Sequence, residues 1–330
     1  MTAVLSRPAL TQLPIGWLGE PRLLRGTNTD LVDHRAHLAV HGPLPMLSRD
    51  ALLATLEAAG LAGRGGAGFP LAAKLRSLRT GEPTVVVNGA EGEPVSAKDH
   101  VLLSRTPQLV LDGALAVAAA IGARRVLVAI TDQQLVEPLQ RALASRPAGR
   151  LFELHAVPEG FIAGEARALI GALNGGPAVP PGRRVLPTEQ GVHGQPTVLS
   201  NAETFAQVGV LVRLGAPAFA GVGTATEPGT TLLTVTGAVS RPGVLEVPFG
   251  TSLGAVAGAT GAGPSQAVVA GGYHGCWLAP APELVLSRAG LATAGGTLGA
   301  GVLIFVGEQT CPLAELGRVA EWLAGESAKQ

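Results

Sequence analysis

The chain has 330 residues, which is enough for two or three domains at about 100–200 residues each. Hydrophobic residues make up 47% of it and aromatic residues only 3%, so the cores must be built from Ala, Val and Leu. The 24 basic and 24 acidic side chains cancel, which argues against nucleic acid or an anionic membrane surface as the main partner. Two cysteines, Cys276 and Cys311, are too few for a disulfide framework or a four-ligand iron–sulfur centre.

Neither the N-terminus nor the most apolar stretch has the pattern of a targeting or membrane segment. Met1 to Pro14 lack the basic and then apolar layout of a signal peptide. The apolar stretch 109–130 is interrupted by Asp112, Arg124 and Arg125, so it predicts a helix, a loop and a strand. We therefore expect a cytoplasmic protein without direct membrane insertion.

Strand and helix patterns alternate along the first two thirds of the chain. The sequence predicts helices at 51–59, 109–121 and 133–144, the first capped by Ser48, and strands at 83–88, 125–130 and 151–156. This alternation is typical of an α/β fold whose sheet has parallel neighbours.

The pattern changes after about residue 220. Strands at 231–237, 244–247 and 267–270, with a helix at 252–258, predict a compact β-grasp-like unit. A strand at 301–306 and a helix at 312–324 close the chain. We expect an N-terminal arm at 1–47, an α/β domain at 48–220, the β-grasp domain at 221–285 and a closing segment at 286–330.

A glycine-rich loop follows the first predicted helix. Gly63-Arg64-Gly65-Gly66-Ala67-Gly68 has the letters of a dinucleotide fingerprint, but a helix precedes it where that motif needs a strand. The backbone N–H groups of such a loop converge on a phosphate, and Arg64 and Lys74 add positive charge nearby. Taken alone, the loop fits an anion cradle and a surface turn equally well.

Three further polar segments lie where ligands bind in α/β sheets. Asn88 to Pro94 follow a predicted strand directly, and their amide and carboxylates suit the polar edge of a flavin or a ribose, although a solvated acidic loop has the same composition. Glu165 begins a helix, as an ordinary first-turn acid also does. Ser200-Asn201-Ala202-Glu203-Thr204 opens another helix, either as a phosphate site or as a capping box of Ser200 with Glu203.

Together these segments resemble the flavin-binding F-type subunit of NADH-quinone oxidoreductase (respiratory complex I) and its Rnf-complex C-subunit relatives. The resemblance is carried by 60–70 with Lys74, by 87–94 with Lys98 and Asp99, and by Gly164-Glu165 and Asn201-Ala202-Glu203-Thr204. Residues 229–280 look like the SLBB β-grasp domain of that family, especially Val235-Thr236-Gly237 and Arg241-Pro242-Gly243. The fold it implies is an FMN-binding domain with a parallel or mixed sheet, followed by an SLBB domain.

The resemblance implies FMN as cofactor, NADH as a possible electron donor, and an iron–sulfur, ferredoxin-like protein or domain as partner. Glu91 and Glu165 are the catalytic candidates. The expected cofactor-binding residues are Gly63, Arg64, Gly65, Gly66, Gly68, Lys74, Asn88, Glu91, Glu93, Glu165, Asn201 and Thr204.

The sequence departs from the family pattern mainly on the nicotinamide side. Ala90 replaces an acid before Glu91, Ala166 replaces a second acid after Glu165, and Leu186 and Ser77 stand where the family has aromatic residues. Ala328 stands at the first cysteine of the family's iron–sulfur motif, so a [4Fe–4S] cluster is not supported in this chain. No metal site is expected.

These departures leave two alternatives to an NADH-dependent flavoprotein. One keeps FMN but takes electrons from a ferredoxin-like donor. The other is a non-catalytic, SLBB-containing scaffold, which the intact glycine loop argues against. Cys276 and Cys311 are expected to be inert.

Overall fold

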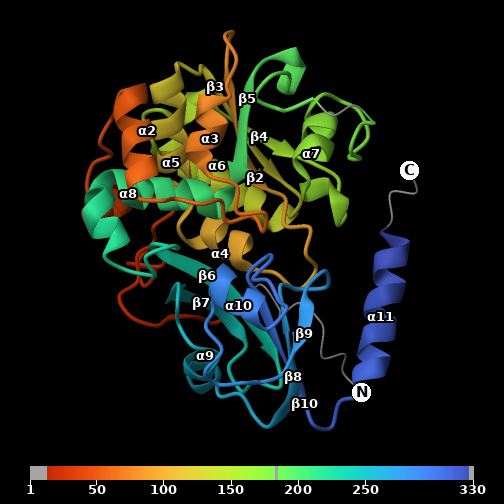
Figure 1. Ribbon diagram of the computed structural model, residues 1–330. Helices are drawn as coiled ribbons and strands as arrows, with labels where there is room; N and C mark the ends of the chain where they lie inside the picture. The colour runs from red at the N-terminus through yellow and green to blue at the C-terminus, as the bar shows by residue number, and fades with distance from the viewer. Residues whose placement is uncertain (1–12, 183–184, 327–330) are drawn as a thin grey trace. The chain divides into compact units, whose positions relative to one another are not determined.

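The computed structural model describes residues 13–182 and 185–326, which form two compact units (Figure 1). The first unit contains residues 22–92 and 99–221, and the second contains residues 13–21, 93–98 and 222–326. The chain thus leaves the first unit after Gly92 and re-enters it at Asp99. Ala328, which stands at the first cysteine position of the family's iron–sulfur motif, lies outside the described residues.

The first unit is built on a four-stranded, all-parallel sheet with the order β4-β3-β2-β5. Its strands are β2 (Thr84–Gly89), β3 (Arg125–Ile130), β4 (Phe152–Ala156) and β5 (Thr197–Asn201). The central strand β2 is buried along its whole length, as expected for a parallel strand covered on both faces. Parallel pairing is confirmed for the strands expected at 83–88, 125–130 and 151–156, whereas β5 was not predicted.

Helices cover this sheet on both faces (Figure 1). They are α1 (His34–His41), α2 (Arg49–Ala58), α3 (Leu71–Arg76), α4 (Lys98–Arg105), α5 (Pro107–Ile121), α6 (Val136–Ser145), α7 (Ala166–Leu173) and α8 (Ala202–Ala220). Helices α5 and α8 pack so closely that a Cβ atom on Gly113 would overlap the Phe205 carbonyl oxygen. Glycine at this crossing therefore lets the two backbones touch.

The second unit is a mixed six-stranded sheet with the order β1-β7-β6-β10-β8-β9. Its strands are β1 (Ile15–Trp17), β6 (Thr230–Gly237), β7 (Gly243–Pro248), β8 (Ser265–Ala270), β9 (Cys276–Leu278) and β10 (Val302–Gly307), with helices α9 (Leu253–Thr260), α10 (Arg288–Thr293) and α11 (Pro312–Gly325). The closing strand β10 pairs with β6 and β8 and so lies inside this sheet. The expected segment 286–330 thus shares its sheet with 221–285.

Two helix caps were predicted, and one of them was wrong. Ser48 caps α2 as expected, accepting a hydrogen bond from the Ala51 N–H. The cap of α8 is Asn201, whose side chain accepts from the Glu203 N–H, while Ser200 belongs to β5. Ser200 and Glu203 therefore do not form a capping box, because α8 begins at Ala202 and Asn201 occupies the cap position.

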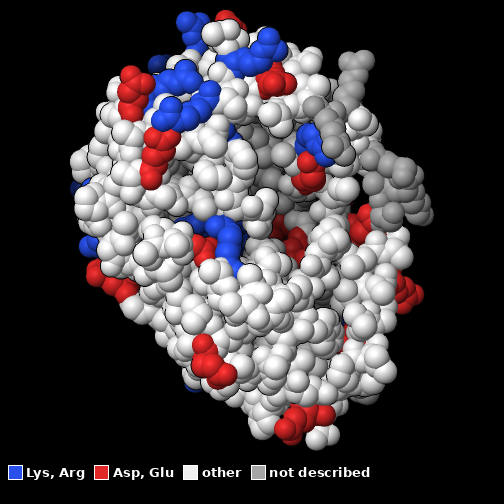
Figure 2. Space-filling model, viewed as in Figure 1, with Lys and Arg blue, Asp and Glu red and all other residues white. Residues whose placement is uncertain are grey.

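Within the described residues, no single helix is long and apolar enough to cross a membrane, although α4 and α5, bent by 92°, pass together on length and composition. The stretch 109–130 divides into α5 and β3, as expected. On the face shown in Figure 2, basic side chains lie mainly over the four-stranded unit.

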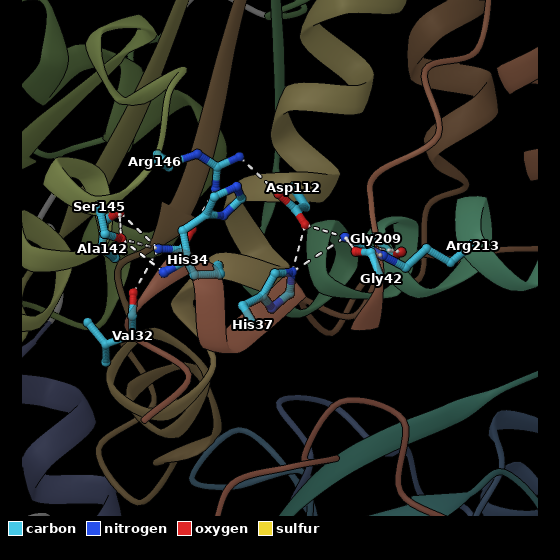
Figure 3. Close-up of polar contacts among 11 residues, drawn as sticks. Val32, His34, His37, Gly42, Asp112, Ala142, Ser145, Arg146, Gly209 and Arg213 are labelled. Atoms are coloured by element: carbon cyan, nitrogen blue, oxygen red, sulfur yellow. Dashed lines mark hydrogen bonds and ion pairs between the residues drawn. The ribbon is translucent and has the colours of Figure 1, made fainter. Parts of the chain in front are cut away.

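A buried cluster of charges ties three helices of the first unit together (Figure 3). Asp112 of α5 is 1% exposed and accepts hydrogen bonds from His37 Nε2 at 2.8 Å, Arg146 Nη2 at 2.9 Å and Arg213 Nη2 at 2.5 Å. Burial alone would raise the pKa of Asp112, but the hydrogen bond from His37 and the charges of Arg146 and Arg213 lower it below its usual range. The Asp112 carboxylate therefore offsets the unfavourable burial of the Arg146 and Arg213 guanidinium groups.

Asp112→Asn is expected to lower the free energy of unfolding by about 3–5 kcal/mol, because it leaves Arg146 and Arg213 buried without a carboxylate. The control is Asp30→Asn, which removes an ion pair between Asp30 and Arg141 whose side chains are 57% and 53% exposed. That variant should cost about 1 kcal/mol or less. Urea denaturation measures the free energy of unfolding of both variants. An equal decrease in the two would contradict this account of the cluster.

Three histidines of α1 stack beside the cluster. The ring centroids of His34 and His37 are 6.2 Å apart, and those of His37 and His41 are 4.8 Å apart. Burial, with the charges of His37, Arg213 and Arg25, lowers the pKa of His41 from 6.5 to about 3. Burial and Arg146 lower the pKa of His34 as well.

Because His41 binds a proton less readily when folded, its stabilising contribution is present above pH 6.5 and is lost as the pH falls toward about 3. Between pH 7 and pH 5 the free energy of unfolding should fall by about 2 kcal/mol from this residue. His41→Gln should flatten that slope in denaturant titrations, whereas His274→Gln, at an exposed position, should leave it unchanged. An unaltered slope in His41→Gln would show that another group controls the acid sensitivity.

Candidate functional site

The candidate residues gather at the carboxyl edge of the four-stranded sheet. Strands β2 and β5 are adjacent and parallel, and their register places Asn88 directly beside Asn201. The carboxyl ends of parallel strands are the edge where ligands bind in open α/β sheets. Two segments far apart in the sequence are thus brought together by strand pairing alone.

Asn88 uses both ends of its amide within the fold. Its Nδ2 donates to the Gly164 carbonyl at 2.8 Å, and its Oδ1 accepts from the Ala90 N–H at 3.0 Å. The side chain therefore holds the loop after β2 against the turn that precedes Glu165. Asn88 shapes this edge of the sheet.

The glycine loop closes on itself and leaves its central N–H groups available. The Gly63 N–H donates to the Phe69 carbonyl at 3.1 Å, which joins the two ends of the loop. Gly66 and Gly68 have φ of +93° and +66°, which side chains rarely adopt. Among the described residues, no backbone N–H from Gly65 to Gly68 has an acceptor. Four neighbouring donors without a protein partner are what a phosphate cradle requires.

Thr204 and Asn201 hold this loop over the start of α8. The Arg64 N–H donates to Thr204 Oγ1 at 2.9 Å, and Thr204 is fully buried. A Cβ atom on Gly65 would lie 3.1 Å from Asn201 Cβ, so glycine allows the loop to lie close to the helix N-terminus. The loop and the helix terminus thus form one site.

The Arg64 side chain is used by the fold itself. Its Nη1 donates to the Ala62 carbonyl at 3.0 Å, and its Nε lies 3.9 Å from Glu203 Oε1, with the two side chains 3% and 0% exposed. A buried carboxylate thus lies near the Arg64 charge, and the expectation that Arg64 adds positive charge for a phosphate stays a prediction.

Lys74 of α3 is a second cation close in sequence to the loop, and it lies against β5. Its Nζ donates to the Leu199 carbonyl of β5 at 2.8 Å. Burial lowers its pKa, and no carboxylate counteracts that shift. A largely buried ammonium group with only a carbonyl partner gains stability when an anion binds beside it.

Two of the predicted carboxylates, Glu91 and Glu165, cap helices. Glu91 accepts the N–H groups of Asp99 and His100 at 3.1 and 3.2 Å and so caps α4. Glu165 accepts the N–H groups of Arg167 and Ala168 at 2.8 and 2.9 Å and caps α7. Both carboxylates stay at the sheet edge, held by helix N-termini, which stabilise their charge.

Glu93 belongs by its contacts to the second unit, where its Oε2 accepts from the Tyr273 N–H at 3.0 Å. Its assignment to cofactor binding stays a prediction. Cys276 and Cys311 are free cysteines, and no group of metal-ligating side chains occurs in the part of the chain that the structure describes.

Asp99 and Asp132 were not among the predicted site residues, although Asp99 was part of the motif that carries the family resemblance. Asp99 Oδ2 accepts from Asn201 Nδ2 at 2.6 Å and so links α4 to α8. Asp132 lies two residues after β3 and accepts from His100 Nδ1 at 2.8 Å. The usable signal was position, because each acid lies shortly after a buried strand or its loop.

Comparison with known proteins agrees with this geometry. Residues 56–210 match the family model of the Nuo51 FMN-binding domain. The chain is 31% identical to the F subunit of NADH-quinone oxidoreductase of Mycobacterium bovis over 321 residues, which cover 89% of this chain and 72% of the relative. This chain belongs to the family of NADH-quinone oxidoreductase F subunits.

Hydrogenase subunits are similar as well. The chain is 36% identical to the NAD-reducing hydrogenase HoxS subunit alpha of Cupriavidus necator over 251 residues, covering 70% of this chain and 41% of that subunit. It superimposes on a chain in the crystal structure of an air-oxidised NAD⁺-reducing [NiFe]-hydrogenase with a TM-score of 0.82 and 32% identity. That match covers 96% of this chain and 55% of the other. The chain thus spans about half the length of its hydrogenase relatives.

The residues present fit the phosphate end of FMN, through the free N–H groups of the glycine loop and the buried Lys74. Lys74→Met is expected to raise the dissociation constant for FMN about 10- to 100-fold, since it removes one charge-assisted contact. The control Arg79→Met removes a cation at an exposed position and should leave the affinity unchanged. Fluorescence titration of FMN measures both, and equal affinities would contradict a role for Lys74.

Proposed function

We propose that the carboxyl edge of the four-stranded sheet binds FMN and that the chain works as an electron-transfer flavoprotein. In this role it takes electrons from NAD(P)H and passes them to an iron–sulfur partner. The observation that carries the proposal is the cluster of four unpaired N–H groups in the glycine loop beside Lys74 and the start of α8. The match of residues 56–210 to an FMN-binding domain supports it.

The protein's own residues would bind FMN and position it. Gly65 to Gly68 and Lys74 would bind the phosphate, while Asn201 and Thr204 keep the loop against α8. Asn88, Glu91 and Glu165 line the edge where the flavin's polar atoms would lie. FMN supplies the hydride acceptance and single-electron chemistry that side chains lack. The assignment of Glu91 and Glu165 as catalytic residues is part of this proposal.

NAD(P)H as donor rests on the relatives, since the F subunits are components of NADH-quinone oxidoreductase and the hydrogenase relative is NAD-reducing. Phe69 is 53% exposed and offers one aromatic face for stacking. Leu186 is 56% exposed and offers none. Ser77 is hydrogen-bonded to the Lys74 carbonyl and to Thr188, each at 3.1 Å.

This partial loss of aromatic faces favours a second candidate, an FMN protein that receives electrons from a ferredoxin-like donor. The division into an arm, an FMN domain, an SLBB β-grasp domain and a closing segment, and the cytoplasmic location, stay parts of the proposal.

The test is to add FMN to the purified protein, remove the excess, record the absorbance spectrum, and then add NADH without oxygen. Bound flavin that bleaches with NADH is the expected result. Bound flavin that stays oxidised with NADH and NADPH, but is reduced by a reduced ferredoxin, would favour the second candidate. Failure to retain any flavin would overturn the flavoprotein proposal.

A further inference from the structure

A histidine and an aspartate, His100 and Asp132, form a hydrogen-bonded pair at the same sheet edge. His100 is the third residue of α4, and its Nδ1 lies 2.8 Å from Asp132 Oδ2. The two side chains are 9% and 18% exposed. The other oxygen of Asp132 accepts from the Gln134 N–H at 2.8 Å, which fixes the carboxylate in place.

The second ring nitrogen of His100 is available for proton exchange. A carboxylate at Nδ1 favours the tautomer with the proton on Nδ1 and leaves Nε2 as the basic atom. Among the described residues, Nε2 of His100 has no hydrogen-bond partner, and it is not one of the buried polar atoms cut off from solvent. A proton can therefore reach this nitrogen from water.

This pair is joined to the candidate site by two short connections. The His100 N–H donates to Glu91 Oε2 at 3.2 Å, and the neighbouring Asp99 N–H donates to the other oxygen of Glu91 at 3.1 Å. Asp99 in turn binds Asn201, which lies against Gly65 of the loop. His100 and Asp99 thus share the Glu91 carboxylate, and Asp99 leads on to Asn201 beside the loop.

Two carboxylates contact His100: Glu91, from the loop after β2, accepts from its backbone N–H, and Asp132, from the end of β3, lies against its ring. The carboxylate of the neighbouring residue, Asp99, binds Asn201. Lys98 begins the same helix but belongs by its contacts to the second unit. A negative charge that develops close to an imidazole ring makes the ring bind a proton more readily.

We propose that His100, oriented by Asp132, is the proton-exchanging group of the cofactor site. It takes up a proton from solvent at Nε2 when the bound cofactor gains negative charge on reduction, and it releases that proton when electrons leave. The N–H bond forms as an O–H bond of a hydronium ion or water molecule breaks, and the reverse exchange returns the proton to water. This inference rests on FMN binding at this edge of the sheet.

The experiment is spectroelectrochemical titration of the FMN-loaded protein at a series of pH values, with the slope giving the protons taken up per two electrons. His100→Gln should lose a fraction of a proton, about 0.2 to 0.5, near neutral pH. Asp132→Asn, which keeps the imidazole but removes its carboxylate, should shift the pH range of that uptake. His155→Gln is the matched control, since Nε2 of His155 lies 3.6 Å from Glu153 Oε2 on β4 and its side chain is 35% exposed.

The outcomes separate this inference from the proposed function. If the unaltered protein retains no FMN, both fail together. If His100→Gln and Asp132→Asn retain FMN and give the same proton uptake as the unaltered protein at every pH, the role of His100 is overturned while FMN binding stands. If both variants lose FMN, His100 and Asp132 support the fold of the site, which also overturns proton exchange.

Discussion

The parallel pairing of β2 with β5 is the constraint on which the candidate site depends. It sets Asn88 beside Asn201, and each asparagine then organises a different part of the edge. Asn88 holds the turn that carries Glu165, while Asn201 caps α8 and binds Asp99. A slip of one residue in this register would place the two amides on opposite faces of the sheet.

Buried polar groups of two kinds occur in the first unit. Those whose charge is balanced by a carboxylate support the fold, and those without such a partner are the ones that we expect to bind an anion. Arg64 and Arg146 are buried cations, but each lies against a buried carboxylate, Glu203 or Asp112. Lys74 is largely buried with only the Leu199 carbonyl as acceptor. By the same reasoning, the loop N–H groups that lack acceptors point to an anion, whereas the capped termini of α4 and α7 need none.

The sequence predicted the central strands, because 83–88 and 125–130 are short apolar runs that a buried parallel strand requires. It did not predict β5, where Pro196 precedes and Asn201 ends a run with few apolar residues. The second asparagine was therefore expected only as part of a helix start. Pairing with a distant strand, which no local pattern contains, is what makes Thr197–Asn201 a strand.

The sequence motifs predicted candidate site residues, but they did not predict the contacts that these residues make. The motifs predict Glu91, Glu165 and Arg64 near a cofactor. The two carboxylates accept hydrogen bonds from helix N-termini, and the Arg64 side chain donates to the Ala62 carbonyl and forms an ion pair with Glu203. Asp99 and Asp132 act through contacts between segments far apart in the chain, so their positions after buried strands indicated the sheet edge but not their partners. Such partners follow from tertiary packing.

The central claim is that FMN binds between the glycine loop and the start of α8. Hydrogen–deuterium exchange of the protein with and without FMN tests it most directly, because bound phosphate would occupy the free N–H groups from Gly65 to Gly68. The account predicts slower exchange confined chiefly to peptides covering 63–74 and 199–204 on adding FMN. Unchanged exchange in those peptides, with protection elsewhere, would contradict it.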